Sequence, residues 1–522
     1  MRAVRPAVQN VLGRMPVVQP GRPLLETTAG GMLGTQVQVS DGQNICAYFG
    51  VPFAAPPVSH LRFETPIAPS FVQLREAVKM PEPSHKNEDC LYLNLFVPAE
   101  RDPNGYPLLV FIPGGGFDKT TCAPHSSFYM AEHYCRQGLA YATIQYRVGL
   151  FGFGSDGTSD FAGNYALKDV CQALLFLREN AQQIGFDPNR ITVAGHSAGA
   201  SILSALSVSP KSRDLFSQVI QFSGSSLSLI STGNLVESET QKIVNKLKLD
   251  TKNSKELLQR IPANDLLKVY KEIGPPLDGT SVIRFSPRVD YDFIPKDYAD
   301  LIQESPTKPT MSTNSRNEGA VFALFNYLES VAEVSLSEAA NFNADDFRRK
   351  IRDLFISERI WGNQTDVGVN DIFDFYASTN NQQEATDNLF YLNCYTNAIH
   401  DCYFGVPAKM EMLEKIRCGW PVFNGIFDRL HDAVHPPKVP LKVPTHGSEY
   451  IYLFGHLKNT EQLFDGTDQK YRDFWISSIV DFVKSGSPKS SKNPEWKQAT
   501  NENAGDVLRI QNEGAYSRAW VA

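Results

Sequence analysis

One ten-residue stretch, ITVAGHSAGA at positions 191–200, restricts the fold of this chain more than any other. It begins with four residues, Ile-Thr-Val-Ala, that predict a buried strand. Gly-His-Ser-Ala-Gly follows, so that Ser197 has a glycine two residues away on either side. A side chain at those flanking positions would clash in a tight turn. The stretch therefore predicts a strand, a sharp turn with Ser197 at its apex, and then a helix.

Short strand-like runs alternate with helical patterns along the rest of the chain. Residues 169–183 carry apolar side chains at the i, i+3, i+4 and i+7 spacing of an amphipathic helix. Runs of mostly continuous apolarity suit a sheet that is covered on both faces, and strand, helix and strand in succession imply crossover connections. We therefore expect an α/β fold with a large, mostly parallel central sheet and helices on both faces. The strand candidates are residues 108–112, 139–146, 191–194, 219–222, 308–313 and 420–427.

The domain organisation predicted from the sequence is one large unit, residues 24–522. The chain is 42% hydrophobic and 20% charged, which is ordinary for a globular protein with a large core. Helical insertions near 234–275 and 320–415 interrupt the strand pattern and are expected to cover the sheet edge where ligands bind. Residues 1–23 contain four arginines and no acidic residue, and we interpret them as a flexible extension.

Charge and hydropathy exclude several functional classes. A net charge of -7 argues against nucleic acid or an anionic membrane as the main partner. No run of 18 apolar residues occurs, so no transmembrane segment is expected. The start of the chain lacks the apolar core of a secretory signal. Its prolines would break the amphipathic helix of a mitochondrial presequence, which leaves mitochondrial targeting as the less favoured alternative to a cytoplasmic location.

A serine nucleophile needs a base, and the base needs an acid to orient it. Five histidines follow Ser197, namely His400, His431, His435, His446 and His456. His446 lies in a loop marked by proline and glycine, from which a side chain can reach into a site. His431 and His435 also lie in a polar loop. The residues alone leave the base open among these three.

The acid and the oxyanion hole are expected at the same sheet edge as Ser197. Spacing does not single out the acid, but Glu318 closely follows the strand candidate 308–313. The stretch Pro-Gly-Gly-Gly-Phe at 113–117 directly follows another strand candidate. Its glycines would let backbone N–H groups approach a developing oxyanion with no side chain in the way.

Together these motifs resemble the type-B carboxylesterase/cholinesterase family, from about residue 24 to the C-terminus. The resemblance implies an α/β-hydrolase fold and a catalytic triad of Ser197, Glu318 and His446. It also implies that the N–H groups of Gly115, Gly116 and Ala198 form the oxyanion hole, and that no metal or cofactor is needed. Two structural ion pairs are implied as well, Arg62 with Glu88 and Arg147 with Asp169. The motifs lie at residues 47–57, 87–95, 113–117, 146–153, 195–199, 317–319 and 446–449.

Several residues depart from the family pattern, and they bear on the cellular compartment and on the choice between a carboxylesterase and a cholinesterase. Cys90 has no cysteine between it and Cys46, and residues 234–275 contain none, so both disulfides usual in the family lack a partner. Missing disulfides indicate a reducing, cytoplasmic compartment. His196 replaces the glutamate that cholinesterases have before the nucleophile, and no tryptophan precedes Trp361. These differences favour a general carboxylesterase over a cholinesterase.

The leading functional hypothesis is a serine carboxylesterase that hydrolyses a small-molecule ester through an acyl-enzyme intermediate. The alternative is a catalytically silent family member that serves as a binding or adhesion protein. Silent members usually lose the serine or the histidine, whereas this chain has a candidate for each triad position.

Overall fold

The central element of the structure is one eleven-stranded sheet. The computed structural model describes residues 21–122, 125–274, 276, 281–325, 332–379, 389–457, 459–489, 496–510 and 516–520. The strands of this sheet are β3 (Thr35–Gln38), β4 (Asn44–Pro52), β6 (Tyr92–Pro98), β7 (Tyr106–Ile112), β8 (Ala140–Ile144), β9 (Phe186–His196), β10 (Gln218–Phe222), β11 (Thr310–Ser315), β12 (Val422–Phe427), β13 (Asp506–Ile510) and β14 (Tyr516–Trp520).

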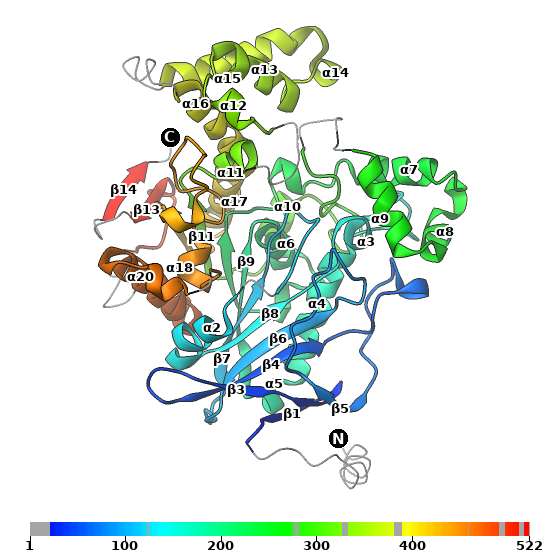
Figure 1. Ribbon diagram of the computed structural model, residues 1–522, viewed down its shortest axis with the longest axis vertical. Helices are drawn as coiled ribbons and strands as arrows, with labels where there is room; N and C mark the ends of the chain where they lie inside the picture. The colour runs from blue at the N-terminus through cyan, green and yellow to red at the C-terminus, as the bar shows by residue number, and fades with distance from the viewer. Residues whose placement is uncertain are drawn as a thin grey trace.

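The strands run parallel through the middle of the sheet and antiparallel at both edges. Their order is β14-β13-β12-β11-β10-β9-β7-β8-β6-β4-β3. Parallel pairing extends from β13 to β8, while β14 at one edge and β6, β4 and β3 at the other pair antiparallel. This order confirms the predicted α/β fold with a mostly parallel sheet (Figure 1). A second sheet of three strands contains β1 (Leu24–Thr27), β2 (Gly30–Leu33) and β5 (Val72–Glu76).

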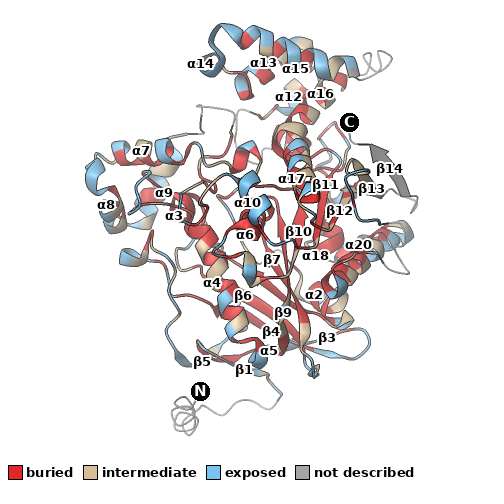
Figure 2. Ribbon diagram, turned by 180° about the vertical axis from the view of Figure 1, so that it is seen from behind, coloured by how far each residue is buried: buried red, intermediate tan, exposed pale blue. Residues whose placement is uncertain are grey.

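Strand β7 shows that both faces of the large sheet are covered. Leu108 belongs to one buried apolar cluster and its neighbour Leu109 to the other. Because successive side chains of a strand point to opposite faces, the two clusters lie on opposite sides of the sheet. Residues of α6 (Ala198–Val208) contribute to the first cluster and residues of α20 (Gly466–Ser485) to the second. Figure 2 shows the buried strands between helices whose outer surfaces are exposed.

All six strands predicted from the sequence are present, as β7 to β12, with ends that differ from the predicted ones by at most five residues. The helix predicted at 169–183 differs more. It is observed as α4 (Tyr165–Glu179) followed by the short α5 (Ala181–Ile184). Asn180 separates the two, because its side-chain amide donates to the Phe176 carbonyl at 2.7 Å and competes with helical hydrogen bonding.

Two groups of helices fall in or next to the ranges 234–275 and 320–415. The first contains α7 (Val236–Lys246), α8 (Ser254–Arg260) and α9 (Ala263–Glu272). In Figure 1 the first group lies at the right of the view, and α12 to α16 lie at the top, beyond the sheet. The second group contains α11 (Gly319–Leu324), α12 (Leu336–Ala339), α13 (Ala344–Leu354), α14 (Glu358–Trp361), α15 (Thr365–Thr379), α16 (Phe390–His400), the π-helical turn η9 (Asp401–Gly405) and α17 (Val406–Arg417).

The N-terminal segment is described only in part. Of residues 1–23, which are expected to form a flexible extension, residues 1–20 lie outside the described part of the chain and residues 21–23 lie within it. Arg22 contacts the fold, since it donates to the Leu33 carbonyl and pairs with Glu76 at 2.7 Å. None of the helices in the described ranges is long and apolar enough to cross a membrane. The other helices beside the large sheet are α2 (Ser127–His133), α3 (Gly149–Phe153), α10 (Tyr298–Glu304), α18 (Tyr450–Phe454) and α19 (Thr460–Leu463).

Candidate active site

The turn between β9 and α6 has the geometry that its sequence predicts. Strand β9 ends at His196, helix α6 begins at Ala198, and Ser197 between them has φ 56° and ψ −126°. A Cβ on Gly195 would lie 2.4 Å from the Gly199 carbonyl oxygen. A Cβ on Gly199 would lie 2.2 Å from the carbonyl oxygen at the end of β7. Both glycines are therefore required for the close approach that holds Ser197 at the apex.

Glu318 and His446 lie together at the same sheet edge. Glu318 directly precedes α11, shortly after the end of β11, and its Oε2 lies 2.7 Å from Nδ1 of His446. Both side chains are buried. The second carboxylate oxygen of Glu318 accepts hydrogen bonds from the Ser223 hydroxyl at 2.7 Å and from the Ser315 N–H. Because several groups fix this carboxylate, it can in turn fix the orientation of the imidazole.

The structure separates His446 from the two other candidate bases. Nε2 of His431 lies 3.2 Å from the Leu463 carbonyl oxygen, and Nε2 of His435 lies 3.0 Å from the Leu441 carbonyl oxygen. Nε2 of His446, by contrast, is buried and has no hydrogen-bond partner within the described part of the chain. It is the nitrogen on the opposite side of the ring from Glu318, and it is thus free to accept a proton.

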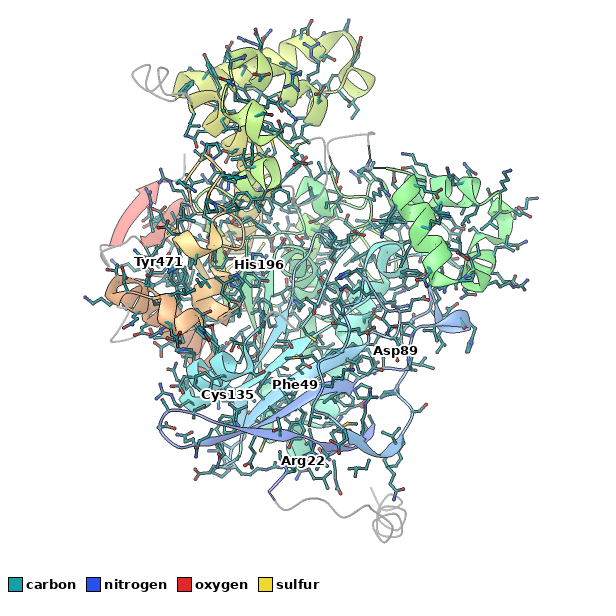
Figure 3. All side chains as sticks on the ribbon, viewed as in Figure 1. Arg22, Phe49, Asp89, Cys135, His196 and Tyr471 are labelled. Carbon is teal, nitrogen blue, oxygen red and sulfur yellow. The ribbon has the colours of Figure 1, made fainter. Side chains whose placement is uncertain are left out.

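The walls around His446 come from the second insertion and from the turn before the nucleophile. Its ring centroid lies 5.5 Å from that of Phe322 in α11 and 4.8 Å from that of Phe404 in η9. The ring of His196 lies 4.7 Å away, and Figure 3 marks this residue at the upper end of the central sheet. Since His196 directly precedes Ser197, this contact places His446 beside the nucleophile turn.

A second buried histidine–glutamate pair lies beside the first. Nε2 of His196 is 2.8 Å from Oε1 of Glu449, and Oε2 of Glu449 accepts the Ser315 hydroxyl at 3.3 Å. Burial lowers the pKa of His196 below its usual value, against the opposing effect of Glu449. Burial alone would raise the pKa of Glu449, but the neighbouring His196 holds that pKa below its usual value. Neither partner was predicted to pair from the sequence.

The glycine loop after β7 packs directly against the nucleophile. A Cβ on Gly114 would lie 2.8 Å from the Cβ of Ser197. Gly115 and Gly116 have φ values of 133° and 62°, which favour glycine. The N–H groups of these two residues donate no hydrogen bond to any other described residue. The N–H of Ala198, at the start of α6, lacks an intrahelical partner as well.

Two further expectations concern supporting contacts. The predicted ion pairs are both present, Arg62 with Glu88 and Arg147 with Asp169, each at 2.7 Å. All eight cysteines are free thiols in the structure. Across the residues that are described, no cluster of three or more histidine, cysteine or acidic side chains is arranged to hold a metal ion.

The large mixed sheet, the sharp strand–serine–helix turn and the helices on both faces define an α/β-hydrolase fold. A model of the carboxylesterase family matches residues 21–519, and the chain belongs to this family. By class it is therefore a carboxylic-ester hydrolase.

Several curated proteins are similar to the chain over most of its length. "Gut esterase 1" of Caenorhabditis elegans is 31% identical, with 94% of this chain and 90% of that protein covered. "Carboxylesterase 5A" of Mus musculus is 26% identical, with 90% and 83% covered. A more partial match is "Neuroligin-2" of Homo sapiens, 30% identical over 54% of this chain and 39% of that protein.

Proposed function

We propose that this protein hydrolyses carboxylic esters by acyl transfer to Ser197, with His446 as the general base and Glu318 as the residue that orients it. The observation that carries the proposal is the 2.7 Å contact between Glu318 and His446, together with the unpartnered Nε2 of His446 beside the nucleophile turn. This is the arrangement that a serine hydroxyl needs for activation.

In the first half-reaction the Ser197 oxygen attacks the ester carbonyl while Nε2 of His446 takes the hydroxyl proton. The buried Glu318 carboxylate stabilises the imidazolium that forms. The tetrahedral intermediate collapses when His446 returns the proton to the leaving alkoxide, and the alcohol departs. Water then attacks the acyl-enzyme with the same base, and the acid product leaves Ser197 with its proton restored.

The oxyanion that develops on the ester carbonyl oxygen requires hydrogen-bond donors. The N–H groups of Gly115, Gly116 and Ala198 are proposed to supply them. Their support is the contact of the glycine loop with Ser197 and the absence of other acceptors for the two glycine N–H groups in the described residues.

Hydrolysis of 4-nitrophenyl esters of increasing acyl length, measured with the wild-type protein and with Ser197→Ala, tests the proposal. Serine-dependent turnover supports it. Binding or adhesion without catalysis, the alternative hypothesis, predicts no turnover above background for either protein.

We also propose a cytoplasmic location, because none of the eight cysteines, all of which lie in described residues, takes part in a disulfide. Alkylation of protein from its native host under denaturing conditions, without reductant, should label all eight thiols. A disulfide at Cys90 would contradict this location.

A further inference from the structure

A large cavity lies next to the glycine loop and has a charge opposite to that of the whole protein. Its volume is about 640 Å³, and Gly116 is part of its lining. The chain has a net charge of -7, yet four of the side chains that line this cavity are cationic and two are anionic. The cations are Lys86, Lys119, Lys271 and Arg284, and the anions are Glu88 and Asp118.

Existing contacts neutralise only part of this charge. Glu88 is already held by two nitrogens of Arg62, at 2.7 and 2.8 Å, and Arg284 lies 3.6 Å from Glu239. Asp118 accepts a hydrogen bond from the Tyr270 hydroxyl at 2.7 Å.

The three lysines Lys86, Lys119 and Lys271 are exposed, and none has an ion-pair partner within the residues that the structure describes. Three free ammonium groups therefore share the cavity with one carboxylate, which makes the cavity positive.

The charges of these lysines also act on a neighbouring side chain. His85 also lines the cavity, and its Nδ1 has no hydrogen-bond partner in the described part of the chain. Burial lowers the pKa of His85, and the charges of Lys86 and Lys119 lower it further. Two of the three lysines thus act on the same point of the cavity wall.

One turn contributes residues both to the cavity lining and to the candidate oxyanion hole. The N–H groups of Asp118 and Lys119 both donate to the Gly115 carbonyl, at 3.2 and 2.9 Å. A Cβ on Gly115 would collide with the Lys119 carbonyl oxygen. The fold of the glycine loop therefore fixes the position from which the Lys119 side chain starts.

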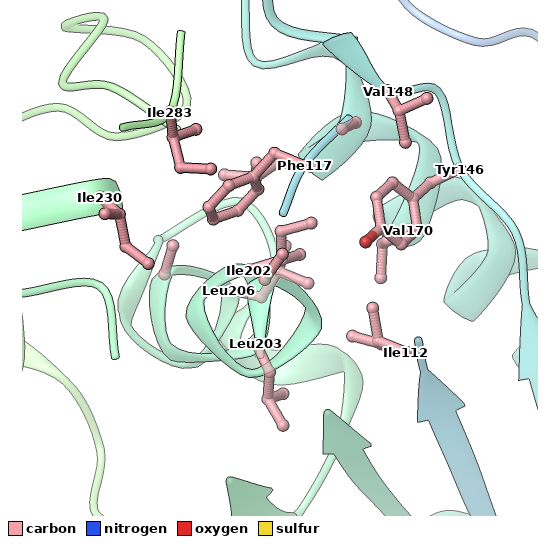
Figure 4. Packing of buried hydrophobic residues seen from close by; sticks show 14 of the residues in the cluster. Ile112, Phe117, Tyr146, Val148, Val170, Ile202, Leu203, Leu206, Ile230 and Ile283 are labelled. Carbon is pink, nitrogen blue, oxygen red and sulfur yellow. The ribbon is translucent and has the colours of Figure 1, made fainter. Parts of the chain in front are cut away.

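Apolar residues form the rest of the wall. Figure 4 shows Phe117, the residue after Gly116, beside Ile283, and both Ile283 and Val148 line the cavity. Leu150, Leu266 and Phe285 extend this apolar surface. An apolar wall with free ammonium groups at its rim suits a chain that is apolar along its length and anionic at its end.

We infer that this cavity binds one arm of the ester substrate and selects esters that carry an anionic group, such as a carboxylate, at the end of an apolar chain. The inference rests on the proposed function, because it places the reacting carbonyl at Ser197 and the glycine loop. It adds the substrate class, which the triad alone does not determine.

A matched pair of substrates tests this selectivity. We would measure kcat/KM for the 4-nitrophenyl monoester of adipic acid and for its neutral methyl ester, each corrected for uncatalysed hydrolysis. The selectivity ratio is kcat/KM for the anionic ester divided by kcat/KM for the neutral ester. It is measured for the wild-type protein, for the triple variant and for the single variants Lys86→Gln, Lys119→Gln and Lys271→Gln. Lys268→Gln is the matched control, since Lys268 is exposed on the same helix α9 as Lys271 but does not line the cavity.

The inference predicts that each single variant lowers the ratio by about two- to three-fold and the triple variant by about ten-fold. Lys268→Gln should leave the ratio unchanged, and salt near 0.5 M should reduce the wild-type ratio through screening. A triple variant with a ratio within about two-fold of the wild-type value would overturn the inference. The proposed function has a separate readout: it fails if the wild-type protein hydrolyses neither ester, or if Ser197→Ala hydrolyses both esters as well as the wild-type protein does.

Discussion

Nδ1 of His446 lies 2.7 Å from Oε2 of Glu318, although 128 residues separate the two along the chain. The parallel sheet explains how they meet. Glu318 follows the end of β11, and His446 lies in the loop before α18. The Asn317 N–H also donates to the Pro444 carbonyl at 3.0 Å, which ties the two segments together beside the pair. This backbone hydrogen bond keeps the segments of Glu318 and His446 close to each other even without the contact between the two side chains.

The choice of base is the first testable consequence. His446→Gln should lower kcat by about 10³- to 10⁴-fold, because glutamine cannot accept and return the serine proton. His431→Gln and His435→Gln should retain most of the activity, since Nε2 of each contacts a backbone carbonyl oxygen, that of Leu463 and that of Leu441 respectively. Steady-state kinetics on a 4-nitrophenyl ester with the three variants provides the comparison. Retention of kcat in His446→Gln together with its loss in either of the other two would show that the base is assigned wrongly.

Replacement of the acid gives a second prediction. Glu318→Gln should lower kcat by about 10²- to 10⁴-fold with little change in KM, because a neutral amide no longer stabilises the imidazolium. Glu304→Gln is the control, since Glu304 is an exposed residue that pairs with Lys296 on the surface. An unchanged kcat in a folded Glu318→Gln protein would remove Glu318 from the mechanism.

The nucleophile turn predicts a large difference between two glycines. Gly199→Ala places a Cβ 2.2 Å from a backbone oxygen and should destabilise the protein by about 3 kcal/mol or more, or prevent folding. At Gly466, in α20, no atom other than those of its chain neighbours and the adjacent helix backbone lies within 4 Å of such a Cβ. Gly466→Ala should therefore change the free energy of unfolding by only about 0.5 kcal/mol. Similar Tm values for the two variants would contradict the close packing of the turn.

The dependence of stability on pH follows from the buried His125. Burial lowers the pKa of this side chain to about 3. Its ring stacks on Phe454 with centroids 4.4 Å apart. In the unfolded chain a histidine has a pKa near 6.5. Below that value the unfolded state binds more protons than the folded state, so the free energy of unfolding falls as the pH falls, by at most about 1.4 kcal/mol per pH unit for this residue.

His125→Gln should make the plot of unfolding free energy against pH shallower between about pH 6 and 4.5. His60→Gln, at an exposed position, is the control. Denaturant unfolding at several pH values measures both slopes. An equally steep slope in His125→Gln would show that another group accounts for the acid sensitivity.

The parts of the site that could be predicted from sequence are those fixed by local geometry. Gly195 and Gly199 predict a sharp turn around Ser197. Glu318 is a candidate acid because it closely follows a strand, but its selection came from the family resemblance. His446 could not be separated from His431 and His435 by its residues alone, since all three lie in loops whose paths depend on distant packing. The family resemblance supplied that choice.

The residues that support Glu318 were missed for the same physical reason. Ser223 donates to it across a separation of 95 residues, and the Glu318 N–H donates to Nδ1 of His400 across 82. The pairing of His196 with Glu449 was also missed, although both residues lie inside motifs that the sequence singles out. Each of these contacts joins segments that come together only at the edge of the folded sheet. A local sequence pattern does not predict contacts between segments so far apart in the chain.

Covalent labelling of Ser197 is the most direct test of the central claim. The wild-type protein, treated with a fluorophosphonate, should gain one adduct per chain, which peptide mapping should locate on Ser197, and ester turnover should be lost in proportion. Ser197→Ala should remain folded, bind no probe and lose activity by several orders of magnitude, as expected for residues that act as a unit. An adduct on another residue, or turnover of an activated ester by Ser197→Ala at the wild-type rate, would contradict the account.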